Sequence, residues 1–585
     1  MRTTIERAVG HGGGVSSDTG IGDSTAQAAS QPASRARADR IMRNGAASEN
    51  VPGSSPRRLA GAAGIMMASL LMSRILGLVR EAVISGKLGQ GAESDIYMAA
   101  FLLPDTLFFL IAGGALSSAF IPVFTELVAR GDDDGASALF STVATVMFAV
   151  VSAFIVAGFV FAEPMVRLLA YGYEPGLVRR IVPLTRIVLP AQLCFFIGGL
   201  LMGAQQARGR FFLPGMGPNV YNIGIIAGGV FLADRLGAAG LCWGALTGAV
   251  IGNFMLQAWG AYKQGLRYRP NLNWRDPNAL RVWKLMLPVI LGLALPQVSI
   301  LLNRVFASTL GEGPMSALTR ANVLMQAPLG IFGHSLSIAV FPTLSAQAAL
   351  ADWNGLRQTI GLGLRFIGFL TIPATAMLIA LGTPITAVLL QHGRFTAEDT
   401  AMTAQGLSFY AIGLAAWSAQ SLLARTFYAM QDTRTPIIIG TAVTMVFIPL
   451  NFLFMGTFRM GFGGLALATS VAATLNAGIM LVVLRGRVGQ LGLRRIGDTT
   501  LRMGLASCAA GVVAWGAARL ISGLVVVGPA AIGAKVSALT VLIGGGGSGI
   551  AVYLLAARLL GVAELGELAG MLRRRRRSGG SDAAE

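Results

Sequence analysis

Stretches of about twenty mostly apolar residues recur along this chain, and they limit its fold more than any other feature. Such a stretch is long enough, as a helix, to cross the hydrocarbon of a bilayer. The stretches centre near residues 72, 110, 150, 193, 222, 250, 294, 332, 372, 414, 446, 473, 512 and 546. The pattern predicts an all-α integral membrane protein with about fourteen transmembrane helices.

The composition agrees with a protein whose outer surface faces lipid. Of the 585 residues, 54% are hydrophobic and 12% are charged, and this charged share is about half that of a soluble globular protein. The net charge of +19 would suggest nucleic-acid binding in a soluble protein. Here the basic residues lie between the apolar stretches, so we expect them to orient the chain in a membrane, with no nucleic-acid partner.

The distribution of basic residues predicts which loops face the cytoplasm. If both termini are cytoplasmic, the inside loops hold most of the cations, from Arg208 and Arg210 to the run Arg573–Arg577, and outside loops such as 310–314 are short and carry few. This bias follows the positive-inside rule. An even number of helices also returns the chain to its starting side, so we expect a multi-pass protein with both termini in the cytoplasm.

An internal repeat divides the apolar part of the chain. Lys87–Ser94 aligns with Thr309–Ser316 at an offset of 222, and Ser117–Pro122 aligns with Ser337–Pro342 at an offset of 220. The offset spans six predicted helices, so both copies have one orientation, a plan that places a transporter's site between its halves. The expected parts are a disordered basic tail (1–58), an N-lobe (59–265), a C-lobe (266–485), two further helices (486–562) and a second basic tail (563–585).

Ionisable residues within the predicted helices are candidates for function, because each costs about 3 kcal/mol or more unless it faces protein or water. Arg74, Arg80 and Glu81 lie in the first helix. Arg74 and Glu81 are seven residues apart and share a face, whereas Arg80 points elsewhere. A guanidinium matches phosphate oxygens, so Arg74 and Arg80 indicate a cationic, phosphate-binding cavity. The alternative is an arginine–carboxylate pair that only fixes helix packing, and Asp95, at the start of the second helix, is expected to position an arginine.

Other polar residues are expected to have structural roles. Arg304, Arg365 and Arg425 lie toward helix ends, where they can reach the interface, and a lone His334 is expected to pack. The run Asp132–Asp134 lies in a turn and is expected to cap a helix. The three cysteines lack metal-ligand spacing, and no GxxxxGK[ST] loop occurs. The sequence thus predicts no catalytic residue, metal site or cofactor.

Six motifs, spread in order over about residues 60–560, resemble those of one family. They are SRILGLVREA (73–82), SDIYMAAFLLP (94–104), GGALSSAFIPVF (113–124), QAPLG (326–330), GRFT (393–396) and FYAMQDTRTP (427–436). Together they are similar to the bacterial lipid II flippases MurJ, also called MviN. The resemblance implies the transporter superfamily that includes the multidrug exporters and the O-antigen flippases, with two lobes around a central cavity and a lipid-tail groove formed by the last two helices.

The resemblance also implies a substrate, a location and site residues. The substrate is lipid II, an undecaprenyl diphosphate carrying the peptidoglycan disaccharide-pentapeptide. The implied location is the bacterial inner membrane, whose lipids surround the protein. Arg74, Arg80 and Asp95 match residues that the family needs in its cavity.

The chain also departs from the family pattern. Phe108 and Val323 stand where many members have arginine, and Arg320, one turn before Val323, is a weak candidate to replace the second of these. No Asp or Glu lies within the seventh, eleventh or twelfth predicted helix, so the carboxylate form of a sodium site found in some relatives is not expected. Two alternatives stay open: a flippase for another polyprenyl-linked glycan, and a non-transporting scaffold of cell-wall synthesis.

Overall fold

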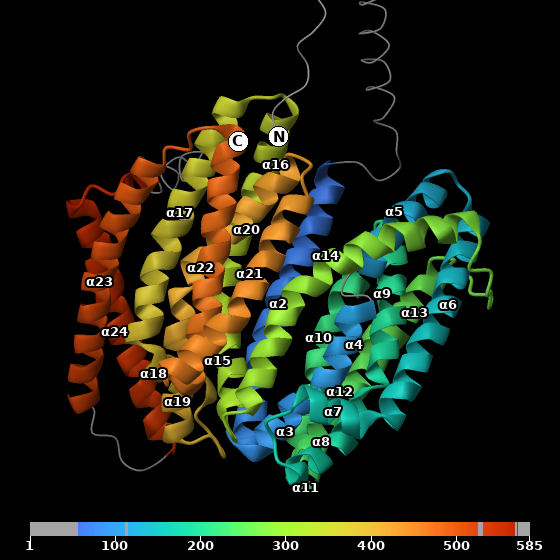
Figure 1. The fold of residues 1–585 in the computed structure, drawn as a ribbon, viewed down its shortest axis with the longest axis horizontal. Helices are drawn as coiled ribbons and strands as arrows, with labels where there is room; N and C mark the ends of the chain where they lie inside the picture. Colours follow the sequence, from blue (N-terminus) through green and yellow to red (C-terminus); the bar gives the residue numbers. More distant parts are fainter. Residues whose placement is uncertain (1–55, 112–114, 525–530, 568–569, 571–585) are drawn as a thin grey trace, which may run out of the picture. The chain divides into compact units, whose positions relative to one another are not determined.

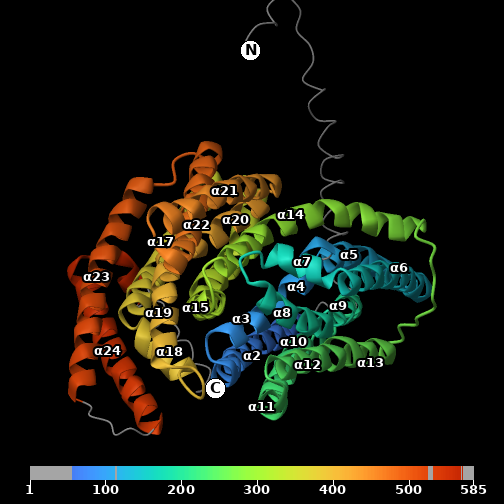
Figure 2. The same ribbon diagram turned by 60° about the horizontal axis from the view of Figure 1, so that its bottom comes forward.

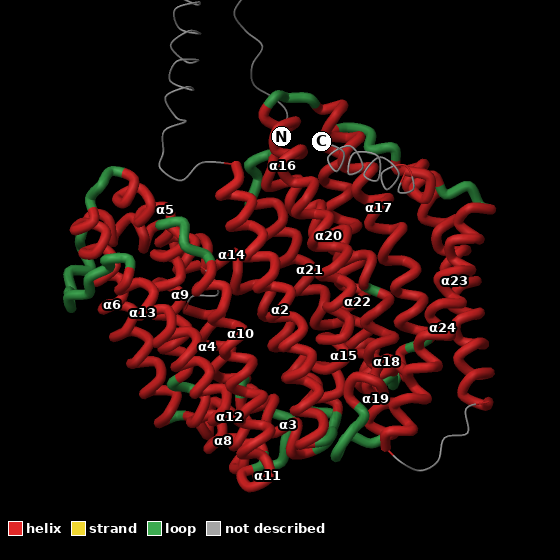
Figure 3. The backbone as a smooth tube through the Cα atoms, turned by 180° about the vertical axis from the view of Figure 1, so that it is seen from behind, coloured by secondary structure: helices red, strands yellow, loops and turns green. Residues whose placement is uncertain are grey.

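The computed structural model describes residues 56–111, 115–524, 531–567 and 570. Within these ranges it consists of helices joined by loops and turns, without a strand (Figures 1 and 3). The all-α prediction is therefore confirmed. The described residues from Gly64 onward form one compact unit, and residues 56–63, the beginning of the first helix, belong to another. Most of the two predicted basic tails, including Arg573–Arg577, lies outside the described residues.

A first helical group runs from α2 to α13. Its elements are α2 (Pro56–Leu88), α3 (Ala92–Ala100), α4 (Leu102–Ile111), α5 (Ala115–Ala129), α6 (Asp133–Val160), α7 (Ala162–Leu169), α8 (Pro175–Val188), α9 (Ala191–Ala207), α10 (Phe212–Ala227), the π-helical turn η2 (Gly228–Leu232), α11 (Ala233–Leu236), α12 (Ala238–Gly248), η3 (Ala249–Met255) and α13 (Leu256–Lys263).

A second helical group runs from α14 to α22, and two more helices follow. The elements are α14 (Pro277–Ser308), α15 (Pro314–Pro328), η4 (Leu329–His334), α16 (Ser335–Ala349), α17 (Trp353–Ala380), α18 (Gly382–Leu390), α19 (Ala397–Ile412), α20 (Leu414–Ala429), α21 (Arg434–Phe452), η5 (Leu453–Thr457), α22 (Gly461–Val488), α23 (Leu493–Leu524) and α24 (Ala531–Leu559). The pair α23 and α24 packs on α17 and α18, at the edge of Figure 1. Helix α14 contacts α4 and α5 as well as α15 and α21, and Figure 2 shows it running across the first group.

The internal repeat is visible at corresponding helix ends. Asp132 caps α6 by accepting a hydrogen bond from the Gly135 N–H at 2.7 Å, which confirms the predicted cap. Asp352 caps α17 in the same way from Gly355, 220 residues later. The π-helical turns η2 and η5 also follow α10 and α21, the equivalent helices of the two groups. The two copies therefore share local geometry as well as sequence.

Ten of the described helical segments are long and apolar enough to cross a membrane, and the bent pair α19 and α20 would make an eleventh. The stretches predicted near residues 72, 110 and 294 are not among them. Helix α2 is long but carries Arg74, Arg80, Glu81 and Lys87, and the stretch near 110 is divided among α3, α4 and α5. Helix α14 has 32 residues, more than a bilayer requires. A multi-pass helical membrane protein is thus confirmed, whereas the count of fourteen stays a prediction.

Buried apolar side chains show where the two groups meet. One cluster joins both groups, because it includes Ile84 and Ile96 of the first and Leu318 and Leu407 of the second. Other clusters lie within the first group with the start of α14, within the second group, or between α17 and the last two helices. The shared cluster surrounds the C-terminal end of α2, so the groups are joined there.

Candidate functional site

Helix α2 presents its charged residues to both helical groups. Arg74 is exposed, and a methyl group added at Gly330 in η4 would lie 3.3 Å from its Cζ atom. Arg80 Nη1 instead donates a hydrogen bond to Asn222 Oδ1 on α10 at 3.1 Å, and its side chain is 27% exposed. The spacing of Arg74 and Arg80 along a helix predicts these different directions. No described residue forms a hydrogen bond or ion pair with Arg74, so its donors are free for a ligand.

One further basic residue of the second group, His334, lies near Arg74, and Arg425 in turn lies near His334. His334, at the end of η4, is exposed and close enough to Arg74 and Arg425 to interact with their charges. Arg425 lies over the ring of Phe341, with its Cζ 5.9 Å from the ring centroid. From the sequence, His334 was expected to pack and Arg425 to reach the interface. The structure instead leaves His334 exposed, near the charges of Arg74 and Arg425.

Glu81 connects Arg80 with Arg320. Its Oε2 lies 3.9 Å from Arg80 Nη2, and its Oε1 lies 3.5 Å from Arg320 Nε. Glu81 is only 2% exposed, so these two arginines compensate a carboxylate that has almost no access to water. Glu81 was not among the predicted site residues, although its position beside Arg80 is a signal that the sequence contains.

Arg320 is fully buried, on the second group's α15. Its Nη2 donates to the Gly89 carbonyl oxygen at 2.8 Å and to Ser94 Oγ at 2.6 Å, and its Cζ lies 5.2 Å from the Phe395 ring centroid. Its Nε and Nη1 atoms have no hydrogen-bond partner among the described residues. In this conformation Arg320 ties α15 to Gly89, between α2 and α3, and to Ser94 in the first turn of α3, and presents no surface to a ligand.

Asp95 is also fully buried and caps a helix of the opposite group. Its Oδ2 accepts hydrogen bonds from the Gly313 N–H at 2.7 Å and the Tyr173 hydroxyl at 2.9 Å, and its Oδ1 accepts one from the Ser316 N–H at 2.9 Å. These amides belong to the N-terminus of α15, where a carboxylate is stabilised by the helix dipole. Burial raises the pKa of the Tyr173 hydroxyl, which therefore stays protonated and donates. Asp95 was expected from the sequence to position an arginine, and in the structure it positions a helix end.

The end of α2 also meets the loop between α18 and α19 backbone to backbone. The Arg394 N–H donates to the Gly86 carbonyl oxygen at 2.8 Å. Gly393 has a φ of +60°, and a Cβ at this position would overlap the Gly86 carbonyl. Glycine therefore permits both the conformation and the contact. With Asp95 and Arg320, this contact forms a closure between the two groups, which we call the α2 closure.

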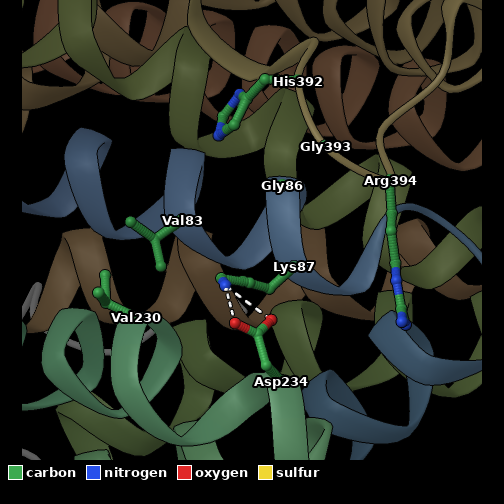
Figure 4. A pocket seen from close by; sticks show the side chains of 8 residues that line it. All are labelled: Val83, Gly86, Lys87, Val230, Asp234, His392, Gly393 and Arg394. Carbon is green, nitrogen blue, oxygen red and sulfur yellow. Dashed lines mark hydrogen bonds and ion pairs between the residues drawn. The ribbon is translucent and has the colours of Figure 1, made fainter.

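A cavity of about 390 Å³ lies beside the α2 closure (Figure 4). It is lined by Val83, Gly86, Lys87, Val230, Asp234, His392, Gly393 and Arg394. Lys87 Nζ lies 2.7 Å from both Asp234 carboxylate oxygens. Burial, followed by the charge of Lys535, lowers the pKa of the His392 ring, so this ring is neutral at neutral pH. None of the four predicted site residues lines the cavity, so it is separate from Arg74 and Arg80.

Two helical groups that share local geometry and meet around intramembrane arginines are typical of a class of membrane transporter. A family model described as lipid II flippase MurJ matches residues 84–532, a range that begins just after Arg80. A probable lipid II flippase MurJ of Vibrio cholerae serotype O1 is 31% identical over 72% of this chain and 82% of its own length. The lipid II flippase MurJ of Burkholderia cenocepacia is 32% identical over 71% of this chain and 82% of its own length. The chain belongs to the MurJ family.

Solved structures show the same fold. A lipid II flippase MurJ in an inward closed conformation superposes with a TM-score of 0.68 at 24% identity, over 84% of this chain and 98% of that one. A multidrug transporter of the MATE family and MOP superfamily, in an inward-facing conformation, gives a TM-score of 0.60 at 14% identity. The match covers 73% of this chain and 98% of that one. At these identities the likeness concerns the fold alone.

Proposed function

We propose that this protein flips lipid II from the cytoplasmic to the outer leaflet of the bacterial inner membrane by alternating access. The observation that carries the proposal is the placement of Arg74, an exposed cation that faces the second helical group and has no hydrogen-bond or ion-pair partner among the described residues. Arg80 lies six residues further along α2. Membership of the MurJ family supports this function. The substrate-binding residues are Arg74 and Arg80, which hold the diphosphate.

The head group is the part of lipid II that needs a protein path. A diphosphate, two sugars and a peptide cannot enter hydrocarbon without hydrogen-bond partners, whereas the polyprenyl tail can remain in the bilayer. A guanidinium stays charged at cellular pH and forms paired hydrogen bonds with phosphate oxygens. Arg74 and Arg80 therefore bind the diphosphate while the tail stays in lipid.

The two lobes of the proposed mechanism are residues 59–265 and 266–485, and both termini are cytoplasmic. With this orientation the α2 closure lies at the outer side, so the structure represents a state closed to the outside. Asp95 and Arg320 then hold the gate, and Glu81 joins this gate to Arg80. A diphosphate bound at Arg80 competes with Glu81 for the guanidinium, which weakens the hold of Glu81 on the gate.

The membrane potential supplies a driving force without an ion partner. With the cytoplasm negative, outward movement of an anionic charge is favourable by about 2.3 kcal/mol per charge per 100 mV. Lipid II flipping in liposomes should therefore accelerate when the potential is imposed in that direction and slow when it is reversed. Flipping that is indifferent to the potential would contradict this part of the proposal.

The substrate is tested by competition in reconstituted liposomes. We expect the purified protein to flip fluorescent lipid II, unlabelled lipid II to compete, and undecaprenyl-linked glycans without the peptide to compete less well. Stronger competition by another polyprenyl-linked glycan would identify that glycan as the substrate. If no lipid-linked glycan is flipped while the protein is folded, a scaffold of cell-wall synthesis becomes the better account.

A further inference from the structure

An ion pair between Arg304 and Asp105 crosses between the two helical groups. Arg304 lies on α14, four residues before its end, and its Nη1 donates to Asp105 Oδ2 on α4 at 2.7 Å. From the sequence, Arg304 was expected toward a helix end, where its side chain can reach the interface. The structure directs it to a carboxylate of the opposite group, so the pair requires its own explanation.

This pair is more open than the buried ion pair that joins the two helical groups at the end of α2. The Arg304 and Asp105 side chains are 26% and 34% exposed, whereas Arg320 and Glu81 are 0% and 2% exposed. An open ion pair contributes little to the stability of a fold. A guanidinium has five N–H donors, and among the described residues Arg304 uses one of them in a hydrogen bond. Its remaining donors are available to a ligand.

The surroundings of Asp105 contain no cation on its own helix. Leu103 and Leu107 of α4 are buried. Phe108, nearly one turn beyond Asp105, packs against Phe195 and Phe196 with centroid distances of 6.2 and 5.7 Å. Helix α4 thus presents one charge here, and that charge is negative. An anion that enters between the two helical groups near Asp105 can therefore bind the Arg304 guanidinium of α14.

We propose that Arg304 is a further diphosphate-binding residue, and that Asp105 holds its guanidinium until phosphate oxygens displace the carboxylate. The proposal rests on the proposed function and adds a cation from the second group to Arg74 and Arg80 of the first. Phosphate and carboxylate oxygens bind the guanidinium fork with similar geometry, so one replaces the other without rebuilding the site. Because the pair links α4 to α14, the same exchange removes a direct tie between the groups.

The test measures binding of undecaprenyl diphosphate to the full-length protein in nanodiscs. Arg304→Gln should weaken binding by about ten- to a hundredfold, since a charged hydrogen-bonding partner of the diphosphate is lost. Asp105→Asn removes the internal competitor and should tighten binding. Arg304→Lys keeps the charge but lacks the planar fork, and should lie between the wild type and Arg304→Gln. Arg487→Gln, which removes the partner of Asp432 near the end of α22, is the matched control and should bind as the wild type does.

A purely structural pair predicts a different pattern. In that case Arg304→Gln and Asp105→Asn would lower the unfolding temperature equally and leave the affinity unchanged, which would overturn the inference. If Arg80→Gln loses binding while Arg304→Gln retains it, the inference fails and the proposed function stands. If the wild type neither binds nor flips the lipid, the proposed function fails as well. If Arg304→Gln does not fold, Arg304→Lys provides the test. Should Arg304→Lys bind the lipid as tightly as the wild type does, the planar guanidinium of Arg304 is not needed and the inference is overturned.

Discussion

The Arg320 guanidinium lies 3.5 Å from the Glu81 carboxylate in a place where neither side chain reaches water. The pair is incomplete, because Arg320 Nε and Glu81 Oε1 have no hydrogen-bond partner among the described residues. A buried ion pair recovers its desolvation cost only when its geometry is good and its remaining donors and acceptors are satisfied. This contact therefore forms only when the two groups are closed at α2, and it stabilises that closed state weakly. A gate that must both open and close requires such a weak contact.

Removing the carboxylate should destabilise the protein through the charge left behind. Glu81→Gln leaves the buried Arg320 without its ion-pair partner, and we expect the free energy of unfolding to fall by about 3 kcal/mol. Thermal unfolding in detergent measures the change. Glu163→Gln is the control, because Glu163 forms an exposed pair with Arg167 that is worth about 0.5 kcal/mol or less. Equal effects of the two substitutions would contradict the role assigned to Glu81.

Asp95 should control how often the α2 closure is formed. Asp95→Asn keeps one acceptor oxygen but loses the charge that caps α15, which should cost the closed state about 1–2 kcal/mol. The hydrogen bond between Thr403 and Gln90, 2.7 Å long, crosses the closure. Disulfide formation in Gln90→Cys with Thr403→Cys, with the native cysteines replaced, therefore reports closure and should slow in the Asp95→Asn background.

The matched control for Asp95 is Asp132→Asn, which likewise keeps an acceptor oxygen but removes the charge from the cap of α6, and it should leave this cross-linking unchanged. Unaltered cross-linking in the Asp95→Asn background would show that this carboxylate does not hold the closure.

The glycine contact at Gly393 gives a steric test of the same closure. Gly393→Ala combines a positive φ with a methyl group that overlaps the Gly86 carbonyl. Gly209→Ala introduces the same backbone strain, about 1–2 kcal/mol, at a φ of +72° where no atom lies near the added methyl. We expect Gly393→Ala to abolish both the cross-link and transport, and Gly209→Ala to retain them. Closure and transport in Gly393→Ala that match those of Gly209→Ala would contradict the steric account.

Some features of the site follow directly from the sequence. The apolar stretches predict the helical membrane class, and helix periodicity predicts that Arg74 and Glu81 share a face of α2. The structure agrees: Arg74 lies against η4 and Glu81 against α15, both in the second group. The cap at Asp132 was equally predictable, because its amide partner is local.

Other features have no signal in a single sequence. The amide partners of Asp95 come from a helix end more than 200 residues away, and a backbone N–H has no residue-type signature. An arginine within an apolar helix has the same pattern whether it faces a cavity or a buried carboxylate, so the burial of Arg320 could not be inferred. Charged residues and broken helices also blur the boundaries of spans, which is why the stretch near residue 110 became α3, α4 and α5.

The central claim is tested most directly by depleting this protein in its own bacterium and following labelled lipid II across the inner membrane. Arg74 has no partner to lose in the described structure, so Arg74→Ala should leave folding intact while removing a cation that the diphosphate needs. We predict that lipid II accumulates in the cytoplasmic leaflet on depletion, that the wild-type protein restores its export, and that Arg74→Ala, expressed at the same level, does not. Continued appearance of lipid II in the outer leaflet on depletion, or full rescue by Arg74→Ala, would contradict the account.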